Sequence, residues 1–262
     1  MKLFDSHCHL DDRSYRNDLE SVLERAAAAD VKKIMLVGIT EKNSMKLVEM
    51  AEQNSVFYAS VGIHPHDAAS CSDEAIGRLK KIATGSVVKA WGETGLDFNR
   101  MFSPKDMQEK WFEKQVEAAL DLNLPLIFHE RDSNGRFLEM LNHFKNSNSS
   151  LSGVVHCFSG SRSEMGTYLD LGLYIGITGI LTIKTRGSDL RKYVKDIPID
   201  RLLIETDAPY LTPAPQKNKT RRNEPAFVRS TLLKLAEVRN ENPEELSAKI
   251  WENTCGLYGI SD

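Results

Sequence analysis

The stretch LFDSHCHL, residues 3–10, joins a short apolar run to two histidines that are separated by a single residue. Leu3 and Phe4 suit a short strand that is buried on both faces. Because side chains at i and i+2 of a strand point the same way, His7 and His9 can hold one metal ion together. The stretch therefore predicts a buried strand that ends in a candidate metal site.

Seven more short apolar runs follow along the chain, and stretches with helical spacing separate them. The runs are Ile34–Val37, Phe57–Val61, Val87–Trp91, Leu124–Phe128, Val154-Val155, Leu173–Ile177 and Leu202–Ile204. The helical stretches include Leu19–Ala26, a long one between Pro104 and Pro125, Leu190–Ile197, Phe227–Arg239 and Pro243–Leu257. This alternation predicts an α/β protein with the TIM (β/α)8 barrel, and a doubly wound open sheet is the structural alternative.

The length and charge restrict the domain organisation and the kind of partner. The 262 residues suit one large domain and contain no long linker, so we expect a single domain over residues 1–262. The polar residues 146–150 predict a turn rather than a domain boundary. With 34 Lys and Arg against 37 Asp and Glu, the net charge is −3, which argues against a protein that coats nucleic acid through bulk charge. An enzyme that holds phosphates through a local basic patch or bound metal stays compatible with this charge.

Three further features indicate a cytoplasmic protein with no membrane partner. No run approaches the ~18 apolar residues that a membrane span needs. The first residues, MKLFDSHCHLDD, carry acids and histidines where a signal peptide needs a long apolar stretch. The four cysteines form no CxxC pair, which favours free thiols in a reducing compartment.

Ionisable residues follow most of the predicted strands at the point where each strand ends. They are His64 after the third run, Glu93 after the fourth, His129 after the fifth, His156 after the sixth, and Glu205 and Asp207 after the eighth. In a parallel barrel these ends open onto one face, which carries the active site. A lone histidine at a strand end is more often structural, but the repetition favours a metal centre.

These residues and their surroundings resemble the TatD family of metal-dependent deoxyribonucleases, within the amidohydrolase superfamily. The matching stretches, in the order of the family, are FDSHCHL, VGIHPH, WGETGLDF, PLIFHERD, GVVHCFSG, YIGITG, LLIETDAPYL and RRNEPAF. The resemblance implies one TatD-like barrel of the metallo-dependent hydrolase type over the whole chain. It also implies two divalent ions, with Mg²⁺ expected in function and Mn²⁺ or Zn²⁺ as alternatives.

The resemblance further implies how the ligands and catalytic residues divide the work. His7, His9 and Asp207 would hold one ion, His129 and His156 the other, and Glu93 would bridge both. Asp207 would orient the attacking water and accept its proton, or act as a plain ligand. His64 is a candidate phosphate donor or leaving-group acid, and a hydrogen bond to a metal ligand is its alternative role.

Residues near the predicted strand ends are candidates for substrate contacts. Arg131 could bind a phosphate with two donors, or pair with Glu130 or Asp132. Glu205 belongs to the site by resemblance, as a substrate contact or as support for a ligand histidine. Lys219 and Arg222 belong to a loop with four cations in six residues, which could bind a phosphate backbone or simply be solvated, and Tyr210 could stack on a base.

The predicted function is that of a hydrolase acting on ester bonds. By resemblance it would be a 3′→5′ exonuclease on single-stranded DNA, with a role in DNA repair or in degrading DNA fragments. A small-molecule amidohydrolase or phosphoesterase with the same metal centre is the alternative, since one fold serves many reactions. A non-catalytic binding module is a third class. The sequence leaves the choice between DNA and RNA open, as well as the oligomeric state, with which a monomer is compatible.

Overall fold

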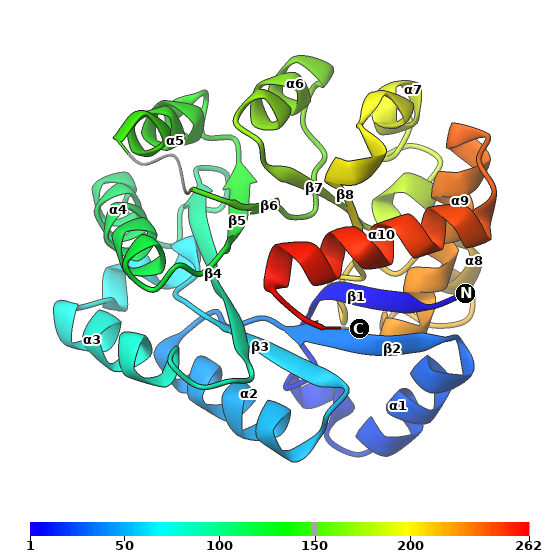
Figure 1. Ribbon diagram of the computed structural model, residues 1–262, viewed down its shortest axis with the longest axis horizontal. Coiled ribbons are helices and arrows are strands. Elements are labelled where there is room, and N and C mark those ends of the chain that lie inside the picture. The colour runs from blue at the N-terminus through cyan, green and yellow to red at the C-terminus, as the bar shows by residue number, and fades with distance from the viewer. Residues whose placement is uncertain (148–150, 262) are drawn as a thin grey trace. The chain divides into compact units, whose positions relative to one another are not determined.

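The computed structural model describes residues 1–147 and 151–261, and its strands and helices alternate along the chain (Figure 1). The strands are β1 (Leu3–Cys8), β2 (Val31–Leu36), β3 (Phe57–Val61), β4 (Val88–Asp97), β5 (Leu126–Arg131), β6 (Gly153–Val155), β7 (Tyr174–Ile177) and β8 (Leu202–Ile204). Their order is β1-β2-β3-β4-β5-β6-β7-β8. The predicted (β/α)8 barrel class is confirmed, and each of the eight predicted runs falls on a strand.

Ten α-helices lie in the described part of the chain. They are α1 (Leu19–Ala28), α2 (Glu41–Gln53), α3 (Asp73–Ile82), α4 (Lys105–Asp121), α5 (Arg136–Ser147), α6 (Arg162–Asp170), α7 (Leu190–Tyr193), α8 (Ala214–Lys217), α9 (Val228–Arg239) and α10 (Pro243–Tyr258). Pro104 is the N-cap of α4, as predicted. The first two residues of the predicted turn at 146–150 belong instead to α5, and residues 148–150 lie outside the described residues.

The chain packs as two compact units. Unit 1 comprises Met1–Leu36, Cys157–Gly256 and Ser261, and unit 2 comprises Val37–His156 and Leu257–Ile260. The prediction of a single domain over residues 1–262 stays a prediction. None of the described helices combines the length and the apolar character that a membrane crossing requires.

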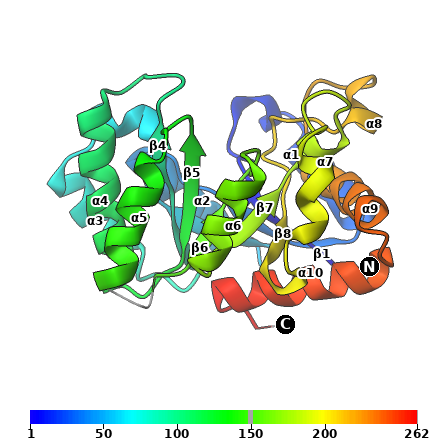
Figure 2. The same cartoon turned by 90° about the horizontal axis from the view of Figure 1, so that it is seen from above.

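In unit 1 the strands β7, β8, β1 and β2 run in parallel. β1 pairs with β2, β7 pairs with β8, and a bridge between Cys8 and Ala208 joins β1 to the chain that follows β8. Helix α10 lies at the end where these strands begin, since Ser247 donates to the carbonyl of Lys2 at 2.9 Å and Asn253 to that of Leu202 at 3.0 Å. Figure 2 shows α8 at the opposite end, where the strands finish.

In unit 2 the strands β3, β4, β5 and β6 pair in parallel in that order. Helices α2 to α5 cover their outer side (Figures 1 and 2). The rings of Phe112, Phe128 and Phe137 form the core beneath α4 and α5, with centroids 5.3–6.1 Å apart. β4 passes very close to β5 at Gly95, which has a φ of +150° and where a Cβ would lie 1.9 Å from the carbonyl oxygen of His129. Glycine at this position therefore lets the two strands that carry Glu93 and His129 approach each other.

Candidate metal centre

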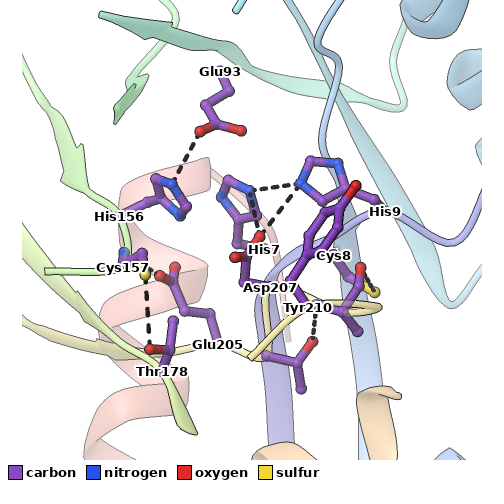
Figure 3. Close-up of polar contacts among 12 residues, drawn as sticks. His7, Cys8, His9, Glu93, His156, Cys157, Thr178, Glu205, Asp207 and Tyr210 are labelled. Carbon is purple, nitrogen blue, oxygen red and sulfur yellow. Dashed lines mark hydrogen bonds and ion pairs between the residues drawn. The ribbon is translucent and has the colours of Figure 1, made fainter. Parts of the chain in front are cut away.

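The donor group of unit 1, which we define as His7, His9 and Asp207, lies where β1 and β8 end. The Nε2 atoms of His7 and His9 are 3.2 Å apart, and Asp207 Oδ1 lies 3.8 Å from the first and 3.5 Å from the second (Figure 3). The Asp207 amide donates to the carbonyl of His7 at 3.0 Å, and that of His9 donates to Ala208 at 2.8 Å. These backbone bonds fix the carboxylate against both imidazoles. His7 lies on β1 and His9 is the first residue after it, and the two imidazoles lie together as their i, i+2 spacing predicted.

Tyr210 lies beside this donor group. Its ring meets that of His9 edge-on, with centroids 6.1 Å apart, and 57% of the residue is exposed. The buried amide of Asn223 donates to the carbonyls of Thr206 at 2.9 Å and Tyr210 at 2.6 Å, which fastens the loop. Asn223 was not singled out from the sequence, although it lies in the matching stretch RRNEPAF.

Glu205 is fully buried behind the end of β8. Its carboxylate accepts a hydrogen bond from the amide of Cys157 (Figure 3). It also accepts one from the hydroxyl of Ser6 at 3.4 Å. Glycine at position 176 leaves the room that the carboxylate takes, since a Cβ there would lie 2.7 Å from Glu205 Oε2. The structure thus places Glu205 inside unit 1 as support for the chain around the donor group.

A second buried carboxyl of unit 1, Asp5, was also missed by the sequence reasoning. It accepts from the amide of Thr206 at 2.8 Å and pairs with the Thr206 hydroxyl at 2.6 Å. Burial raises the pKa of Asp5 to about 8, against the opposing hydrogen bonds from Thr206. At neutral pH Asp5 is therefore a neutral acid that joins β1 to the chain after β8.

The donor group of unit 2, which we define as His64, Glu93, His129 and His156, is arranged around one carboxylate oxygen. Glu93 Oε1 lies 2.7 Å from His129 Nδ1, 3.0 Å from His156 Nε2 and 3.3 Å from His64 Nε2. His64 Nε2 and His129 Nδ1 are 3.2 Å apart. His64 follows β3, His129 lies on β5 and His156 directly follows β6. The sequence placed Glu93 at the end of its strand, but β4 continues for four more residues to Asp97, so Glu93 lies inside the strand.

Electrostatics in this group favour an ionised carboxylate beside a neutral imidazole. Burial raises the pKa of Glu93, but the nearby charges of His156 and His64 and the hydrogen bond with His129 outweigh it, and the pKa falls well below its usual range. Burial lowers the pKa of His64 to about 4, although the charge of Glu93 opposes this shift. His64 is therefore neutral at pH 7, which is the form that binds a metal ion.

Asp97, four residues beyond Glu93 on β4, supports the group from behind. Its Oδ2 lies 3.2 Å from His129 Nε2 and 2.8 Å from His66 Nε2. Burial raises the pKa of Asp97, but hydrogen bonds with His129 and His66 outweigh it and lower the pKa below its ordinary value. Hydrogen bonding to Asp97 raises the pKa of His129 in turn, against the effect of burial. The period of a strand, which brings residues 93 and 97 to one face, could have identified Asp97.

Three polar side chains form hydrogen bonds that hold the loop around the exposed residue Phe102, near His66. The Ser103 hydroxyl donates to the carbonyl of His66 at 2.8 Å, and the Gln108 amide donates to the carbonyl of Ser103 at 2.8 Å. Asp97 Oδ1 accepts from the amide of Arg100 at 2.8 Å. Phe102 is 67% exposed on this loop, with its ring edge-on to that of His66 at 4.8 Å. The hydrogen-bonded loop thus presents an exposed aromatic ring beside His66.

Of the remaining residues predicted to contact substrate, two are exposed and the third is held in an ion pair. Arg131 at the end of β5 and Lys219 after α8 are exposed. Arg222 instead donates with both terminal nitrogens to Asp18, at 2.7 and 2.6 Å, and its guanidinium lies over the ring of Tyr15. A substrate contact would require Arg222 to leave this ion pair.

Glu130, whose effect the sequence did not reveal, organises the turn after β5. Its Oε1 accepts from the amide of Ser133 at 3.0 Å and from the Ser133 hydroxyl at 2.7 Å. Arg131 has Glu130 and Asp132 as chain neighbours, but Asp132 instead accepts from Asn99 at 2.6 Å. The alternative pairings that were considered for Arg131 are therefore taken by other partners.

Both donor groups fit a divalent cation by their chemistry and their spacing. Each combines imidazole nitrogens with a carboxylate oxygen, a set that suits Zn²⁺ or Mn²⁺, while carboxylates also suit Mg²⁺. A tetrahedral ion with bonds of about 2.1 Å separates its ligand atoms by about 3.4 Å. In unit 1 the ligand atoms lie 3.2–3.8 Å apart, and in both groups three such atoms fall within 4.8 Å of one another.

Comparisons with known proteins agree with this chemistry. The chain is 37% identical over 259 residues to the "Uncharacterized metal-dependent hydrolase YabD" of Bacillus subtilis, covering 99% of this chain and all of that protein. It is 40% identical over 261 residues to the "3'-5' ssDNA/RNA exonuclease TatD" of Klebsiella pneumoniae, covering 98% of each. The crystal structure of YJJV, a TatD homolog from Escherichia coli K12, matches 99% of this chain and 98% of its own with a TM-score of 0.88 and 29% identity. The family model "TatD related DNase" matches residues 4–259, and the chain belongs to this family.

Proposed function

We propose that this protein is a metal-dependent nuclease that hydrolyses the phosphodiester bonds of single-stranded DNA from the 3′ end. The observation that carries the proposal is the pair of donor groups, each of which brings imidazole nitrogens and a carboxylate oxygen to ligand spacing. Membership of the TatD related DNase family supports hydrolysis of a phosphate ester. The relative named as a 3'-5' ssDNA/RNA exonuclease supports the direction and the single strand.

The proposed cofactors are two divalent ions, one for each donor group. His7, His9 and Asp207 would hold the first ion, and Glu93, His129 and His156 the second. His64 Nε2 lies as close to Glu93 Oε1 as a ligand needs, so we add His64 to the second set. Magnesium is the expected ion in function, with Mn²⁺ or Zn²⁺ as alternatives, and a bridging role for Glu93 stays a prediction.

When bound, such ions lower the pKa of water and neutralise charge on the phosphate. The chain's own contribution is to orient the nucleophile and to receive its proton. Asp207 presents a carboxylate that the backbone holds beside His7 and His9, so it can orient a water molecule and accept the proton. Because His64 is neutral at pH 7, we assign it a ligand role in preference to that of leaving-group acid.

The proposed substrate contacts come from exposed side chains near the donor groups. The ring of Tyr210 would stack on a base, and Arg131 and Lys219 would bind phosphates. Glu205 is buried and accepts the amide of Cys157, so we assign it a supporting role in preference to a substrate contact.

The proposed setting is the cytoplasm, with which the free state of all four cysteines is compatible. Repair of DNA or degradation of its fragments is the expected role. Both the role and the monomeric state stay predictions.

The test is the release of mononucleotides from single-stranded DNA that carries a label at either the 3′ or the 5′ end. The purified protein is supplied with Mg²⁺, Mn²⁺, Zn²⁺ or EDTA, and RNA, duplex DNA, a lactone and a small phosphodiester complete the panel. We expect the 3′ label to leave first, as a mononucleotide, only when a metal ion is present. Glu93→Gln should abolish release, while Asp121→Asn, on the exposed outer helix α4, should leave it unchanged.

Equal release with metal and with EDTA, or from Glu93→Gln, would contradict the proposal. Hydrolysis of the lactone alone would favour the small-molecule alternative.

A further inference from the structure

Unit 1 contains a cleft of about 600 Å³ between the chain after β7 and the loop around α8. Ile183 and Arg186 line one side, and Leu211, Lys217 and Arg221 line the other. The Tyr210-Leu211 step connects it to the donor group, because Asp207 lies only three residues before Tyr210. The ring of Tyr210 lies 6.1 Å from that of His9, so the residue that directly precedes the lining residue Leu211 also contacts the donor group.

The cleft gathers positive charge that is not compensated. Arg186, Lys217 and Arg221 are exposed, and across residues 1–147 and 151–261 none of the three forms an ion pair. Lys192 and Lys249, two exposed cations of unit 1 outside the cleft, are paired with Asp189 and Glu252, each at 2.6 Å. Three unpaired cations around one concave surface repel one another, and an anion bound among them relieves this repulsion.

Hydrogen bonds hold both walls of the cleft in place. The guanidinium of Arg191 donates to the carbonyls of Leu181, Ile183 and Lys184 at 2.7, 3.0 and 2.7 Å, which fixes the wall that carries Arg186. On the other side, the hydroxyl of Thr212 donates to the carbonyl of Arg221 at 2.8 Å. The amide of Ala214 donates to Thr182 at 2.8 Å and ties the two walls together. The cations are therefore presented by a frame that is ordered before a ligand arrives.

We propose that this cleft binds the phosphodiester backbone of a nucleic-acid strand beyond the bond that is cut. This inference rests on the proposed function and assigns that function a second binding region, with Arg186, Lys217 and Arg221 as phosphate contacts. Ile183 and Leu211 supply apolar surface for sugars or bases between the phosphates. Contacts of this kind depend on charge and stacking and read no sequence.

The experiment compares two triple variants that remove the same charge from unit 1. The test variant is Arg186→Ala/Lys217→Ala/Arg221→Ala, and the control is Lys192→Ala/Arg201→Ala/Lys249→Ala, whose three cations are paired with acids outside the cleft. Binding of a nuclease-resistant phosphorothioate strand of about 12 nucleotides is measured against salt concentration by fluorescence anisotropy. Hydrolysis of a dinucleotide by the metal-loaded enzymes is measured in parallel.

We expect the test variant to bind the long strand at least about tenfold more weakly than the control. Its plot of log affinity against log salt should be shallower by about 2, since each lost phosphate contact on a single strand removes about 0.7. Hydrolysis of the dinucleotide should be unchanged, because so short a substrate ends before the cleft. Arg186→Lys/Arg221→Lys, which keeps the charge, should retain most of the salt dependence and guards against a folding defect.

Equal binding by the test and control variants would overturn the proposal, as would an equal loss of dinucleotide hydrolysis and strand binding. If the wild-type protein cleaves no nucleic acid at all, the proposed function fails. The binding measurement would still show, independently of cleavage, whether the cleft binds a nucleic-acid strand.

Discussion

The two donor groups reach ligand spacing in different ways. In unit 1, the three candidate ligand atoms, which are His7 Nε2, His9 Nε2 and Asp207 Oδ1, lie 3.2–3.8 Å apart. In unit 2, three imidazoles converge on a single oxygen of Glu93 at 2.7–3.3 Å. The first group depends on two segments of the chain, while the second depends on four, which lie on or just after β3, β4, β5 and β6.

The carboxyls behind the two groups also differ, and in opposite directions. Burial raises the pKa of Asp5 in unit 1 to about 8. Burial also acts to raise the pKa of Asp97 in unit 2, but the hydrogen bonds with His129 and His66 outweigh it and lower the pKa. Unit 1 therefore supports its ligands with a neutral acid, and unit 2 supports them with a charge that polarises a ligand histidine. Removing a carboxylate should therefore lower stability and metal affinity more in unit 2 than in unit 1.

The largest effect is expected for Glu93→Gln compared with Asp207→Asn. Both should lower nuclease activity by about 10³-fold or more, the scale on which a lost partner for transition-state charge acts. In EDTA, however, only Glu93→Gln should markedly lower the melting temperature, because it leaves the imidazoles of His64, His129 and His156 without their shared anion. Activity assays, metal analysis and thermal unfolding check this difference. Equal melting temperatures for the two variants would show that unit 2 is not the more strongly coupled group.

The next effect is expected for Asp97→Asn. An outer carboxylate that orients a ligand histidine typically contributes about 10–100-fold to metal affinity or activity. We expect metal affinity to fall by this factor, because the amide does not supply the charge that holds His129. Titration with a metal chelator measures it. Asp106→Asn, in the first turn of α4, serves as the control, and an unchanged affinity in Asp97→Asn would remove Asp97 from the supporting role.

The two exposed aromatic residues provide a third comparison between the units. The ring of Tyr210 meets that of His9 edge-on in unit 1, and the ring of Phe102 meets that of His66 edge-on in unit 2. Stacking on one base contributes about 1–3 kcal/mol, so Tyr210→Ala and Phe102→Ala should each raise KM for single-stranded DNA by about 5-fold to 150-fold. Leu233→Ala, an exposed apolar residue on α9, should have no effect. If only one of the two aromatic variants raises KM, the single-stranded DNA contacts the aromatic residue of one unit only.

Sequence reasoning predicted the strands and helices, and it singled out candidate ligands that the structure brings together, for physical reasons that are local. Apolar runs such as Phe57–Val61 must be buried wherever they lie, and the i, i+2 period already places His7 beside His9. Apart from Asp97, which the strand period could have identified, the supporting residues depend on contacts between distant parts of the chain. Arg222 forms an ion pair with Asp18, about 200 positions away in the chain. From the sequence alone, Arg222 was interpreted as one of four cations in a loop that binds phosphates or is solvated. Distant partners of this kind decide which cations of the loop remain available to a substrate.

The smallest effect is expected for Asp5→Asn, and it tests the opposite pKa shifts behind the two groups. The pKa of Asp5 is about 8 in the folded chain against an ordinary 3.8, so folding favours the protonated form. As pH rises between these values, the unfolded chain loses its proton while the folded chain keeps it, and stability falls. This group can contribute at most about 1.4 kcal/mol per pH unit to the decline.

Asparagine mimics the neutral acid, so Asp5→Asn should flatten the fall of melting temperature across that window, measured in EDTA. Asp97 has the opposite sign, because its lowered pKa gives stability that is present above the ordinary value and lost as pH falls. Asp97→Asn should therefore be less stable than wild type near neutral pH and approach it in acid. If both variants shift the pH profile in the same direction, the two carboxyls do not differ in the way that separates unit 1 from unit 2.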